Sequence, residues 1–385
     1  MKKICIVTGS RAEYGLLYWL IKDLNNSPEF EMQLVVTGMH LSPEFGSTYS
    51  EIEKDGFKID KKVEMLLSSD SSNGVVKSMG LGMIGMADAL GELKPDLMVV
   101  LGDRFEILSA CSAALIYKIP IAHLHGGEVT TGAFDESIRH AITKMSHLHF
   151  TAAEEYQNRV IQLGEEPKRV FNVGAMGMDN IRRLKLLDKN ELSDAIGFNF
   201  HKKNLLITFH PVTLDNEPAE IQVKALFKAL DELDDTGLIF TMPNADTEGR
   251  KIMALIKEYC SLNSNKAKVF SSLGQLRYLS TLAVVDGVIG NSSSGILEAP
   301  SFKIGTINIG DRQKGRIMAE SVIQCNANQI SITKALDCLF SKKFQTCLKD
   351  LKNPFDRGGA SEKIIKTLKE TNFETLLQKS FYNLN

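Results

Sequence analysis

Residues 97–104 read Leu-Met-Val-Val-Leu-Gly-Asp-Arg, and residues 119–128 read Ile-Pro-Ile-Ala-His-Leu-His-Gly-Gly-Glu. Each stretch begins with a short apolar run and ends in glycine and ionisable side chains. Short apolar runs bounded by turn residues are typical of buried strands. Because an open α/β sheet binds its ligands at the carboxyl ends of its strands, Asp103 and Glu128 are predicted to lie at a binding site.

The alternation of strands and helices along the rest of the chain decides the fold class. It runs from residue 3 to about 175, and a second series begins near residue 204. Such alternation predicts parallel sheets with helices on both faces. We therefore predict an α/β protein of two Rossmann-like doubly wound domains, with an N-terminal domain over 1–177, a charged linker over 178–203 and a C-terminal domain over 204–385. The carboxyl ends of both sheets are expected to border a ligand cleft.

The individual elements follow from the same pattern. Strands are predicted over Ile4–Thr8, Met32–Thr37, Phe57–Val63, Leu97–Leu101, Ile119–Leu124, Leu148–Thr151, Val170–Val173, Leu205–Phe209, Gly237–Met242, Lys268–Phe270, Val284–Ile289 and Gly305–Ile309. Helices in the first half are predicted over Tyr14–Asn25, Gly74–Leu93, Glu106–Tyr117, Glu136–Ser146 and Ala153–Leu163.

The composition of the chain indicates which binding partners and which cellular compartment to expect. With 385 residues the chain is longer than one hydrophobic core usually supports, and 43% hydrophobic with 24% charged residues is ordinary for a soluble protein. A net charge of -2 argues against nucleic-acid binding. The six cysteines are scattered without a Cys-x-x-Cys pair, and no apolar run is long enough for a signal peptide or a membrane span. We expect a cytoplasmic protein with reduced thiols and no membrane partner.

Two cofactor classes are disfavoured by the motifs. The turn Gly9-Ser10-Arg11-Ala12-Glu13 is no G-x-G-x-x-G fingerprint, and the second strand ends on Thr37-Gly38 without an acid, so a nicotinamide dinucleotide is not expected. His123 and His125 share a face if their strand continues, and with Glu128 they have the residue types of a metal site. Further ligands have no obvious source, so we predict no metal.

The candidates for proton transfer are four carboxylates, Asp103, Glu128, Asp135 and Glu136. Paired carboxylates in a shielded cleft can have their pKa values driven apart, which gives one acid and one base. A structural alternative is that Asp135 caps the following helix and that Asp103 forms an ion pair with its neighbour Arg104. Both interpretations stay open for Asp135, and we favour function for Asp103.

A second group of residues has the chemistry of a nucleotide diphosphate site. Small residues after the predicted strand 284–289 let backbone amides approach an anion at a helix N-terminus, and a carboxylate one turn later can accept from two ribose hydroxyls. These residues are Ser292, Ser293, Ser294, Gly295 and Glu298. A helix N-cap is the alternative role for a serine there. Arg11, Arg104 and Arg312 each follow a strand-terminal turn, and together they predict a phosphate clamp.

Taken together, the motifs resemble the hydrolysing branch of the UDP-N-acetylglucosamine 2-epimerases, which feeds the synthesis of sialic-acid-type sugars. The resemblance covers nearly the whole chain and rests on Thr8–Glu13, Val36–His40, Gly102–Arg104, His125–Glu128, Ile138–Lys144, Asn291–Gly295 and Ile309–Arg316. It implies a glycosyltransferase-B fold, a final helix around Ala360–Glu370 packed back on the N-terminal domain, and a homo-oligomer, dimer or tetramer. It also implies that no metal or nicotinamide cofactor is needed.

The resemblance also assigns roles to residues. Asp103 and Asp135 fall on catalytic acids of the family, and His210 falls on a histidine near the diphosphate. Many relatives carry a catalytic glutamate where this chain has His125, so either Glu128 takes that role or His125 carries the proton itself. The nucleotide contacts that the resemblance implies are Arg11, Ser292, Ser293, Ser294, Glu298 and Arg312.

The reaction implied by the resemblance converts UDP-N-acetylglucosamine and water to N-acetylmannosamine and UDP through a 2-acetamidoglycal. Related enzymes perform the same reaction on a UDP- or GDP-linked 2,4-diacetamido-2,4,6-trideoxy sugar in legionaminic acid synthesis, and the stretch Val63–Asp70 resembles that group. A glycosyltransferase on the same fold is a further alternative, which needs only one base. A non-catalytic nucleotide-sugar sensor is another, and it has no need of several carboxylates beside a diphosphate.

Overall fold

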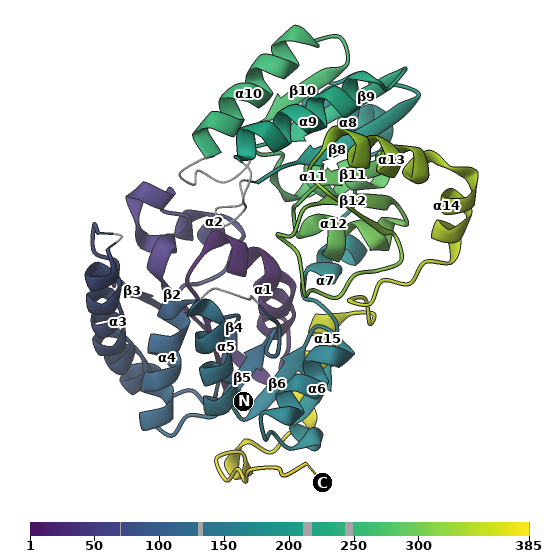
Figure 1. Ribbon diagram of the computed structural model, residues 1–385. Coiled ribbons are helices and arrows are strands. Elements are labelled where there is room, and N and C mark those ends of the chain that lie inside the picture. Colours follow the sequence, from purple (N-terminus) through teal and green to yellow (C-terminus); the bar gives the residue numbers. More distant parts are fainter. Residues whose placement is uncertain (70, 130–133, 211–217, 243–248, 385) are drawn as a thin grey trace. The chain divides into compact units, whose positions relative to one another are not determined.

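The computed structural model describes residues 1–69, 71–129, 134–210, 218–242 and 249–384 (Figure 1). The chain divides into two compact units, which are unit 1 (Met1–Arg182 and Arg357–Asn385) and unit 2 (Arg183–Asp356). Unit 1 runs to Arg182 and unit 2 begins at Arg183, whereas the expected boundaries were 177 and 203. The residues from 357 onward, which include the final helix expected to pack on the N-terminal domain, belong to unit 1. The expected linker over 178–203 contains helical residues, since the chain folds into α7 and α8 there.

The elements of unit 1 follow the predicted alternation. Its strands are β1 (Lys2–Thr8), β2 (Phe30–Thr37), β3 (Lys61–Val63), β4 (Leu97–Leu101), β5 (Ile121–Leu124), β6 (Leu148–Thr151) and β7 (Val170–Asn172). Its helices are α1 (Arg11–Asn25), α2 (Tyr49–Lys54), α3 (Ser72–Leu93), α4 (Phe105–Ile116), α5 (Phe134–Met145), α6 (Glu154–Gln162), α7 (Gly177–Arg183, which ends on the first residue of unit 2) and α15 (Ala360–Glu370).

The sheet of unit 1 is parallel and covered on both faces. Its described strands have the order β3-β2-β1-β4-β5-β6-β7, so successive strands are added on one side of β1 up to β3 and on its other side from β4 onward. Ile4 and Ile6 of β1 face a core shared with α1 and α15, while the alternate residues Cys5 and Val7 face a core shared with α3, α4 and α5. Helices cover both faces of the sheet, and side chains alternate between the faces along a strand. Every residue of β1 that faces either core is therefore apolar, which explains its continuous apolar run.

Unit 2 repeats the architecture. Its strands are β8 (Lys203–Thr208), β9 (Thr236–Thr241), β10 (Ala267–Phe270), β11 (Gly287–Gly290), β12 (Gly305–Ile309) and β13 (Val322–Cys325). Its helices are α8 (Lys189–Ile196), α9 (Ala219–Asp231), α10 (Gly249–Leu262), α11 (Gly274–Val284), α12 (Ser294–Leu297), α13 (Gln329–Phe340) and α14 (Lys342–Cys347). Within the described residues the strand order is β10-β9-β8-β11-β12-β13, all parallel, with its own core.

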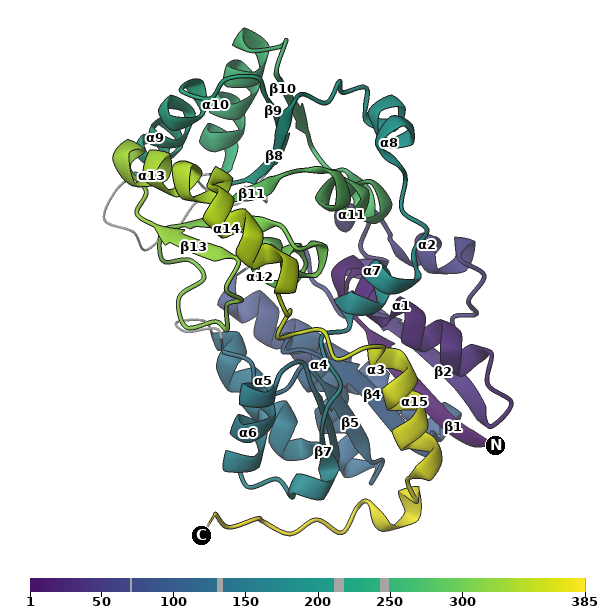
Figure 2. The same cartoon turned by 90° about the vertical axis from the view of Figure 1, so that its right-hand side faces the viewer.

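Helix α15 lies beside α1 in unit 1, although the two are far apart in the sequence (Figure 2). The buried Asp179 accepts hydrogen bonds from the backbone N–H groups of Ala360 (2.9 Å) and Ser361 (2.7 Å), which satisfies the N-terminus of the helix. At the other end Lys2 Nζ donates to the carbonyl oxygens of Leu368 and Thr371. Both helix ends are therefore fastened to unit 1.

Two predicted strands differ from the observed structure, and one observed strand was not predicted. The run Val284–Ile289 is not one strand, because α11 continues to Val284 and β11 begins only at Gly287. The strand expected over Phe57–Val63 is confined to Lys61–Val63. Strand β13 was absent from the predicted set, since its four half-exposed residues lack an apolar run. Asp70, the last residue of the stretch that resembles the diacetamido-sugar enzymes, lies outside the described residues.

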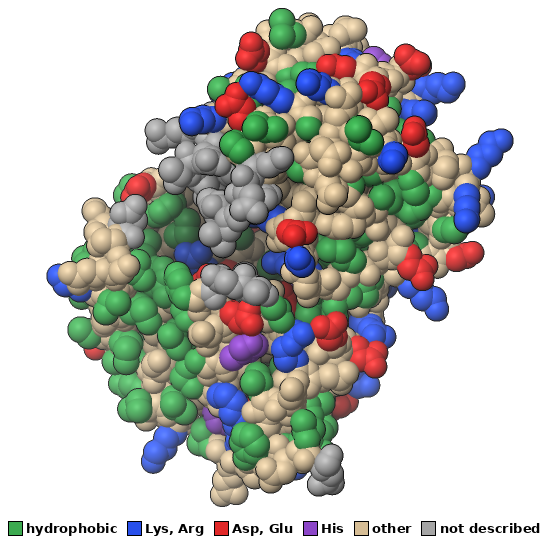
Figure 3. Space-filling view, in the orientation of Figure 1, with side chains coloured by type: hydrophobic (Ala, Val, Ile, Leu, Met, Phe, Trp, Pro, Cys, Tyr) green, Lys and Arg blue, Asp and Glu red, His purple; other side chains and the backbone are tan. Residues whose placement is uncertain are grey.

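An apolar surface covers the helices α3 and α4 of unit 1 (Figure 3). The side chains of Val76, Met83 and Ile84 on α3 and of Leu115 and Ile116 on α4 are exposed there. Large apolar patches mark interaction sites in soluble proteins. The homo-oligomer expected from the family resemblance stays a prediction. No helix of the described chain has the length and the hydropathy to cross a membrane.

Candidate active site

Asp103 lies at the carboxyl end of β4 in unit 1. Gly102, with φ of 80°, turns the chain out of the strand, and its carbonyl oxygen accepts a hydrogen bond from His123 Nε2 at 2.8 Å. The Asp103 carboxylate forms an ion pair with Arg139 on α5, whose side chain is 7% exposed. The alternative in which Asp103 pairs with its neighbour Arg104 is therefore wrong.

The electrostatic surroundings of Asp103 bring the predicted carboxylates together. Burial raises the pKa of Asp103 above its usual value of 3.8, and the ion pair with Arg139 opposes that shift. The negative charges of Asp135 and Glu128 also raise the pKa of Asp103. Three predicted proton-transfer groups thus interact at one end of one sheet.

Asp135 lies inside the first turn of α5, so it is not the residue that caps the helix from outside. The residues directly before α5, 130–133, lie outside the described part of the chain. A carboxylate in the first turn is stabilised by the helix dipole, and Arg139 follows one helical turn later. Asp135 and the ion pair of Asp103 therefore belong to one neighbourhood.

His125 and Glu128 form the second arm of this site. The chain leaves β5 at Leu124, and His125 adopts φ of 63°, an uncommon conformation for a residue other than glycine. His125 Nδ1 lies 2.8 Å from Glu128 Oε1. The Gly126-Gly127 turn lets the backbone fold back, so that the glutamate returns to the imidazole.

His123 has a different environment from His125. It is fully buried, with Nε2 bonded to the Gly102 carbonyl and Nδ1 3.2 Å from Thr143 Oγ1. Burial lowers the pKa of His123 to about 3, so the ring is neutral. Strand β5 ends at Leu124 and His125 has a positive φ, so the condition under which the two histidines would share a face is not met. Among the described residues, no three His, Cys, Asp or Glu side chains gather as a metal site.

Arg104 forms an ion pair with Glu106, and the carboxylate of Glu13 interacts with both residues. Arg104 Nε donates to Glu106 Oε1 at 2.5 Å, and the Gly9 N–H donates to Glu13 Oε2 at 2.6 Å. Burial, followed by repulsion from Glu106, raises the pKa of Glu13 to about 8. A Cβ at Gly9 would lie 2.5 Å from Glu106 Cγ, so the turn after β1 requires glycine. The Nε of Arg104, expected to bind phosphate, is thus used within the protein.

Arg11 lies on the surface of unit 1. Its Nε forms an ion pair with Glu51 at 2.9 Å, and both side chains are exposed. Exposed pairs of this kind contribute about 0–1 kcal/mol, so the pair leaves Arg11 able to move to another anion. The predicted clamp of three arginines stays a prediction for Arg11 and Arg312.

In unit 2, Asn291 joins the segments that follow three strands. Its Oδ1 accepts from the His210 N–H (2.7 Å), and its Nδ2 donates to the His210 carbonyl (2.8 Å). Its own carbonyl oxygen accepts from Arg312 Nη1 (3.0 Å) and Gln313 Nε2 (2.8 Å). Since Asn291 is buried, this network fixes the backbone of His210 and orients Arg312.

Glu298 is the most unusual carboxylate of unit 2. Tyr278 Oη donates to Ser294 Oγ at 2.6 Å, and Ser294 hydrogen-bonds in turn to the Glu298 carboxyl group. Burial raises the pKa of Glu298, and the bond from Ser294 opposes the shift. Its Oε2 is buried and has no partner among the described residues. An unsatisfied buried acceptor costs about 1–3 kcal/mol, which a ligand hydroxyl would recover.

The serines 292–294 do not form the helix cap that was the structural alternative, and the helix that begins at Ser294 is short. Ser293 precedes α12 without a side-chain cap bond, and Ser292 Oγ accepts only a long bond from the Ser294 N–H (3.4 Å). Because α12 has four residues, the dipole expected at its start is small. Gly295 packs against Thr306, whose Cγ2 would lie 2.6 Å from an added Cβ. Its small size serves this packing, and its predicted contact with phosphate stays a prediction.

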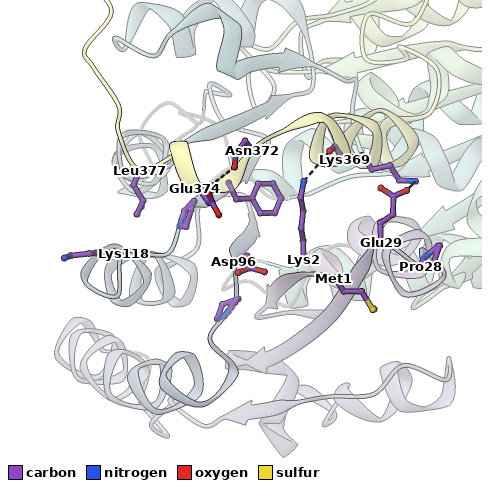
Figure 4. A pocket seen from close by; sticks show the side chains of 13 residues that line it. Met1, Lys2, Pro28, Glu29, Asp96, Lys118, Lys369, Asn372, Glu374 and Leu377 are labelled. Carbon is purple, nitrogen blue, oxygen red and sulfur yellow. Dashed lines mark hydrogen bonds and ion pairs between the residues drawn. The ribbon is translucent and has the colours of Figure 1, made fainter.

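A separate hollow of about 740 Å³ opens at the amino ends of the strands of unit 1 (Figure 4). Lys2 Nζ donates into the C-terminal turn of α15 and lies over the Phe373 ring, while Lys369 pairs with Glu29. The side chains of Lys2, Glu29 and Lys369 are thus paired with one another or with the backbone. Because Asp103 lies at the opposite ends of these strands, this hollow is not the predicted site.

The sequence did not identify several partners of the site, and two of them had a local signal. Arg139 stands one turn after Asp135, the spacing of an ion-pairing neighbour on a helix. Glu13 follows Ser10 by three residues, as in a capping box. Tyr278 and Asn291 act across long sequence distances, for which the local pattern gives no signal.

Comparison with known proteins adds the family. A sequence profile described as UDP-N-acetylglucosamine 2-epimerase matches residues 22–369. A GDP/UDP-N,N'-diacetylbacillosamine 2-epimerase (hydrolyzing) from Campylobacter jejuni is 48% identical over 384 residues, which cover 100% of this chain and 99% of that protein. A UDP-N,N'-diacetylbacillosamine 2-epimerase (hydrolyzing) from Legionella pneumophila is 35% identical over 372 residues, 96% of each chain.

Among solved structures, a UDP-GlcNAc 2-epimerase from Neisseria meningitidis, solved with UDP-GlcNAc bound, matches with a TM-score of 0.77. It is 19% identical and aligns over 96% of this chain and 100% of its own. The likeness concerns the fold, and it confirms the predicted α/β class with two doubly wound, glycosyltransferase-B-type domains.

Proposed function

The chain belongs to the UDP-N-acetylglucosamine 2-epimerase family, and from this premise we propose that it is a hydrolysing 2-epimerase of nucleoside-diphosphate-linked N,N'-diacetylbacillosamine. The observation that carries the proposal is the 48% identity with the Campylobacter jejuni enzyme over the full length of both chains. UDP-N-acetylglucosamine, the main expectation of the sequence, is the less supported substrate, because the Legionella pneumophila relative also acts on the diacetamido sugar by its name.

The proposed reaction needs a base, a second acid and a leaving diphosphate. One carboxylate removes the C2 proton while the C1–O bond breaks and the nucleoside diphosphate leaves, which gives a 2-acetamidoglycal. Water then adds at C1, and a proton is delivered to the other face of C2. The products are the nucleoside diphosphate and a free sugar inverted at C2. Positioned carboxylates are suited to both proton transfers.

Unit 1 supplies these carboxylates in the proposal. Asp103 and Glu128 are the acid–base pair, and Arg139 fixes the Asp103 carboxylate by their ion pair. Asp135 contributes negative charge that keeps the pKa of Asp103 raised. A carboxyl group with a raised pKa both accepts and returns a proton at a pH closer to neutral. A glycosyltransferase requires no deprotonation at C2, so three interacting carboxylates favour the epimerase.

Unit 2 supplies the nucleotide contacts in the proposal. Glu298 accepts the ribose hydroxyls through the oxygen that has no partner, and the serines 292–294 approach the diphosphate. Arg312 adds a charged donor, and His210 lies near the diphosphate, as the family resemblance implies. The ties of Arg312 and His210 to Asn291 support this assignment, because they order both residues without a ligand.

We expect Glu298→Gln to weaken UDP binding about ten- to a hundredfold, since a hydrogen bond to a charged acceptor contributes about 1.5–3 kcal/mol. Calorimetry with UDP and 2'-deoxy-UDP measures this directly. The unchanged protein should prefer UDP, while the variant should bind both ligands alike. Glu320→Gln, on the surface of the same unit, is the matched control. Unchanged affinity in Glu298→Gln would remove Glu298 from the ribose site.

The loss of kcat/KM at low pH is expected to occur at a higher pH than the ionisation of an ordinary aspartate would cause. Asp103 must be ionised to accept a proton, and its pKa is raised above 3.8, so activity is lost as the pH falls through that raised value. Because Arg139 lowers the pKa of Asp103, Arg139→Gln should move the limb to still higher pH. A limb at or below pH 3.8, or one unmoved in Arg139→Gln, contradicts this role of Asp103.

Substrate identity is tested by turnover on three nucleotide sugars without an acceptor. UDP- and GDP-linked N,N'-diacetylbacillosamine and UDP-N-acetylglucosamine are compared by kcat/KM, with the free sugar identified by NMR. One diacetamido substrate should exceed UDP-N-acetylglucosamine at least about tenfold, because a site that binds the second acetamido group loses those contacts with the other sugar. Equal or better turnover of UDP-N-acetylglucosamine would restore the first expectation. No turnover without an acceptor would favour a transferase.

A further inference from the structure

The imidazole ring of His125 is bound at both of its nitrogens. Nδ1 lies 2.8 Å from Glu128 Oε1, and Nε2 accepts a hydrogen bond from the backbone N–H of Met176 at 3.1 Å. A backbone N–H can only donate, so Nε2 must present its lone pair to Met176. The ring then carries its proton on Nδ1, directed at the carboxylate of Glu128.

The backbone holds this ring in an uncommon conformation. His125 has φ of 63°, and its N–H donates to the Phe150 carbonyl oxygen at 2.9 Å, which extends the pairing of β5 with β6 by one residue. Gly127 follows with φ of 80°, and a Cβ there would lie 2.3 Å from the Tyr156 carbonyl oxygen. Residues at positive φ persist where the surroundings fix them, and they are concentrated at functional sites.

The donor on the other side of the ring is equally fixed. Met176 is fully buried in the core of unit 1, and its carbonyl oxygen accepts from the Asp179 N–H at 3.3 Å. The side chains of His125 and Glu128 are 15% and 26% exposed, so water competes little for either contact. The Met176 N–H, the His125 imidazole and the Glu128 carboxylate thus form a chain of two hydrogen-bond contacts.

We propose that His125 is a positioning residue, which holds the Glu128 carboxylate in one orientation through its Nδ1–H and does not carry the proton itself. A proton shuttle at Nε2 would need the lone pair that Met176 already occupies. Of the two roles that the sequence left open, the structure therefore favours Glu128 as the acid–base group. The inference rests on the proposed function, because it requires Glu128 to act at C2 of a nucleotide sugar.

Three variants of His125 test separately the contact that each ring nitrogen makes. The amide nitrogen of asparagine lies near the place of Nδ1, whereas the amide of glutamine reaches the place of Nε2. His125→Ala and His125→Gln are expected to lower kcat about tenfold to a hundredfold with little change in KM, since a small misplacement of a reacting group costs that much. His125→Asn should recover at least about tenfold of the loss, because it restores the donor to Glu128 and tolerates positive φ.

The glutamine variant is the matched control, because it carries the same amide group at the same position with one more methylene. If His125→Gln retains more activity than His125→Asn, the proposal fails. It also fails if His125→Ala removes a limb near neutral pH from the pH–rate profile, because that limb would belong to a histidine that carries protons.

Nitrogen-15 NMR of the full chain with labelled histidine gives a readout that does not need turnover. We expect His125, assigned by its loss in His125→Asn, to be protonated on Nδ1 and unprotonated on Nε2 at neutral pH. A proton on Nε2 would overturn the proposal. If the unchanged protein turns over no nucleotide sugar, the proposed function fails, while this spectrum still decides whether His125 presents its proton to Glu128.

Discussion

Asp103→Asn is expected to lower kcat at least about a hundredfold, the usual scale for a positioned acid or base. Asparagine keeps the shape of the side chain and an oxygen that accepts from Arg139, so the ion-paired geometry is largely retained while the basicity is lost. The loss should therefore appear in kcat with UDP affinity and melting temperature nearly unchanged. Measuring all three quantities separates a chemical effect from an unfolded site.

Asp96→Asn is the matched control for this variant. Asp96 directly precedes β4, at the other end of the strand that leads to Asp103, and its carboxylate accepts from the Lys3 N–H at 2.7 Å. The same chemical change there should leave turnover intact. If Asp103→Asn retains more than about a tenth of the activity, Asp103 is not a proton-transfer group.

Glu128→Gln is expected to be comparably severe. Glutamine keeps an oxygen that accepts from His125 Nδ1–H, so the side chain stays in place, but it cannot transfer a proton at C2. The variant should bind UDP normally and should exchange no C2 hydrogen of the substrate with solvent, which NMR in deuterated water measures. Turnover is expected to fall at least about a hundredfold.

Glu154→Gln serves as the control for Glu128→Gln, because Glu154 lies exposed at the start of α6 and pairs only loosely with Arg357 at 3.4 Å. A Glu128→Gln protein with a near-normal rate would show that Glu128 is not one of the two proton-transfer groups. Because His125→Ala is expected to be milder than Glu128→Gln, the reverse order would also contradict the account.

The fold could be predicted from the sequence because its strands are local signals. Leu97–Leu101 and Leu205–Phe209 are short, largely apolar runs, and strands buried between two layers of helices typically have that composition. The signal fails where the burial is partial. The edge strand Val322–Cys325 is half-exposed. The apolar residues before Asp286 belong to the end of helix α11 and not to a strand.

The candidate site was predictable in its position and less so in its contacts. A carboxylate that directly follows a buried strand must lie at the sheet's carboxyl edge, which is why Asp103 could be identified. Its partner depends on how α5 packs, and the sequence suggested the adjacent Arg104 only as a structural alternative and did not point to Arg139. The orientation of His125 depends on the amide of Met176, a backbone group that no side-chain pattern reveals.

The same distinction holds in unit 2. The segment 291–298 was identifiable because an asparagine and three serines follow a strand. That Asn291 fixes the backbone of His210, and that Tyr278 binds Ser294, are contacts between residues far apart in the chain. Such contacts are set by the register of parallel strands and by helix packing, so they become visible only in the folded chain.

Turnover in deuterated water tests the central claim most directly. The protein is incubated with UDP-linked N,N'-diacetylbacillosamine, without an acceptor, and the sugar is examined by NMR and mass spectrometry. The account predicts a free sugar inverted at C2 that carries one deuterium at that carbon, together with UDP. A free sugar without deuterium, or with unchanged configuration at C2, would show simple hydrolysis and contradict the proton transfer assigned to Asp103 and Glu128.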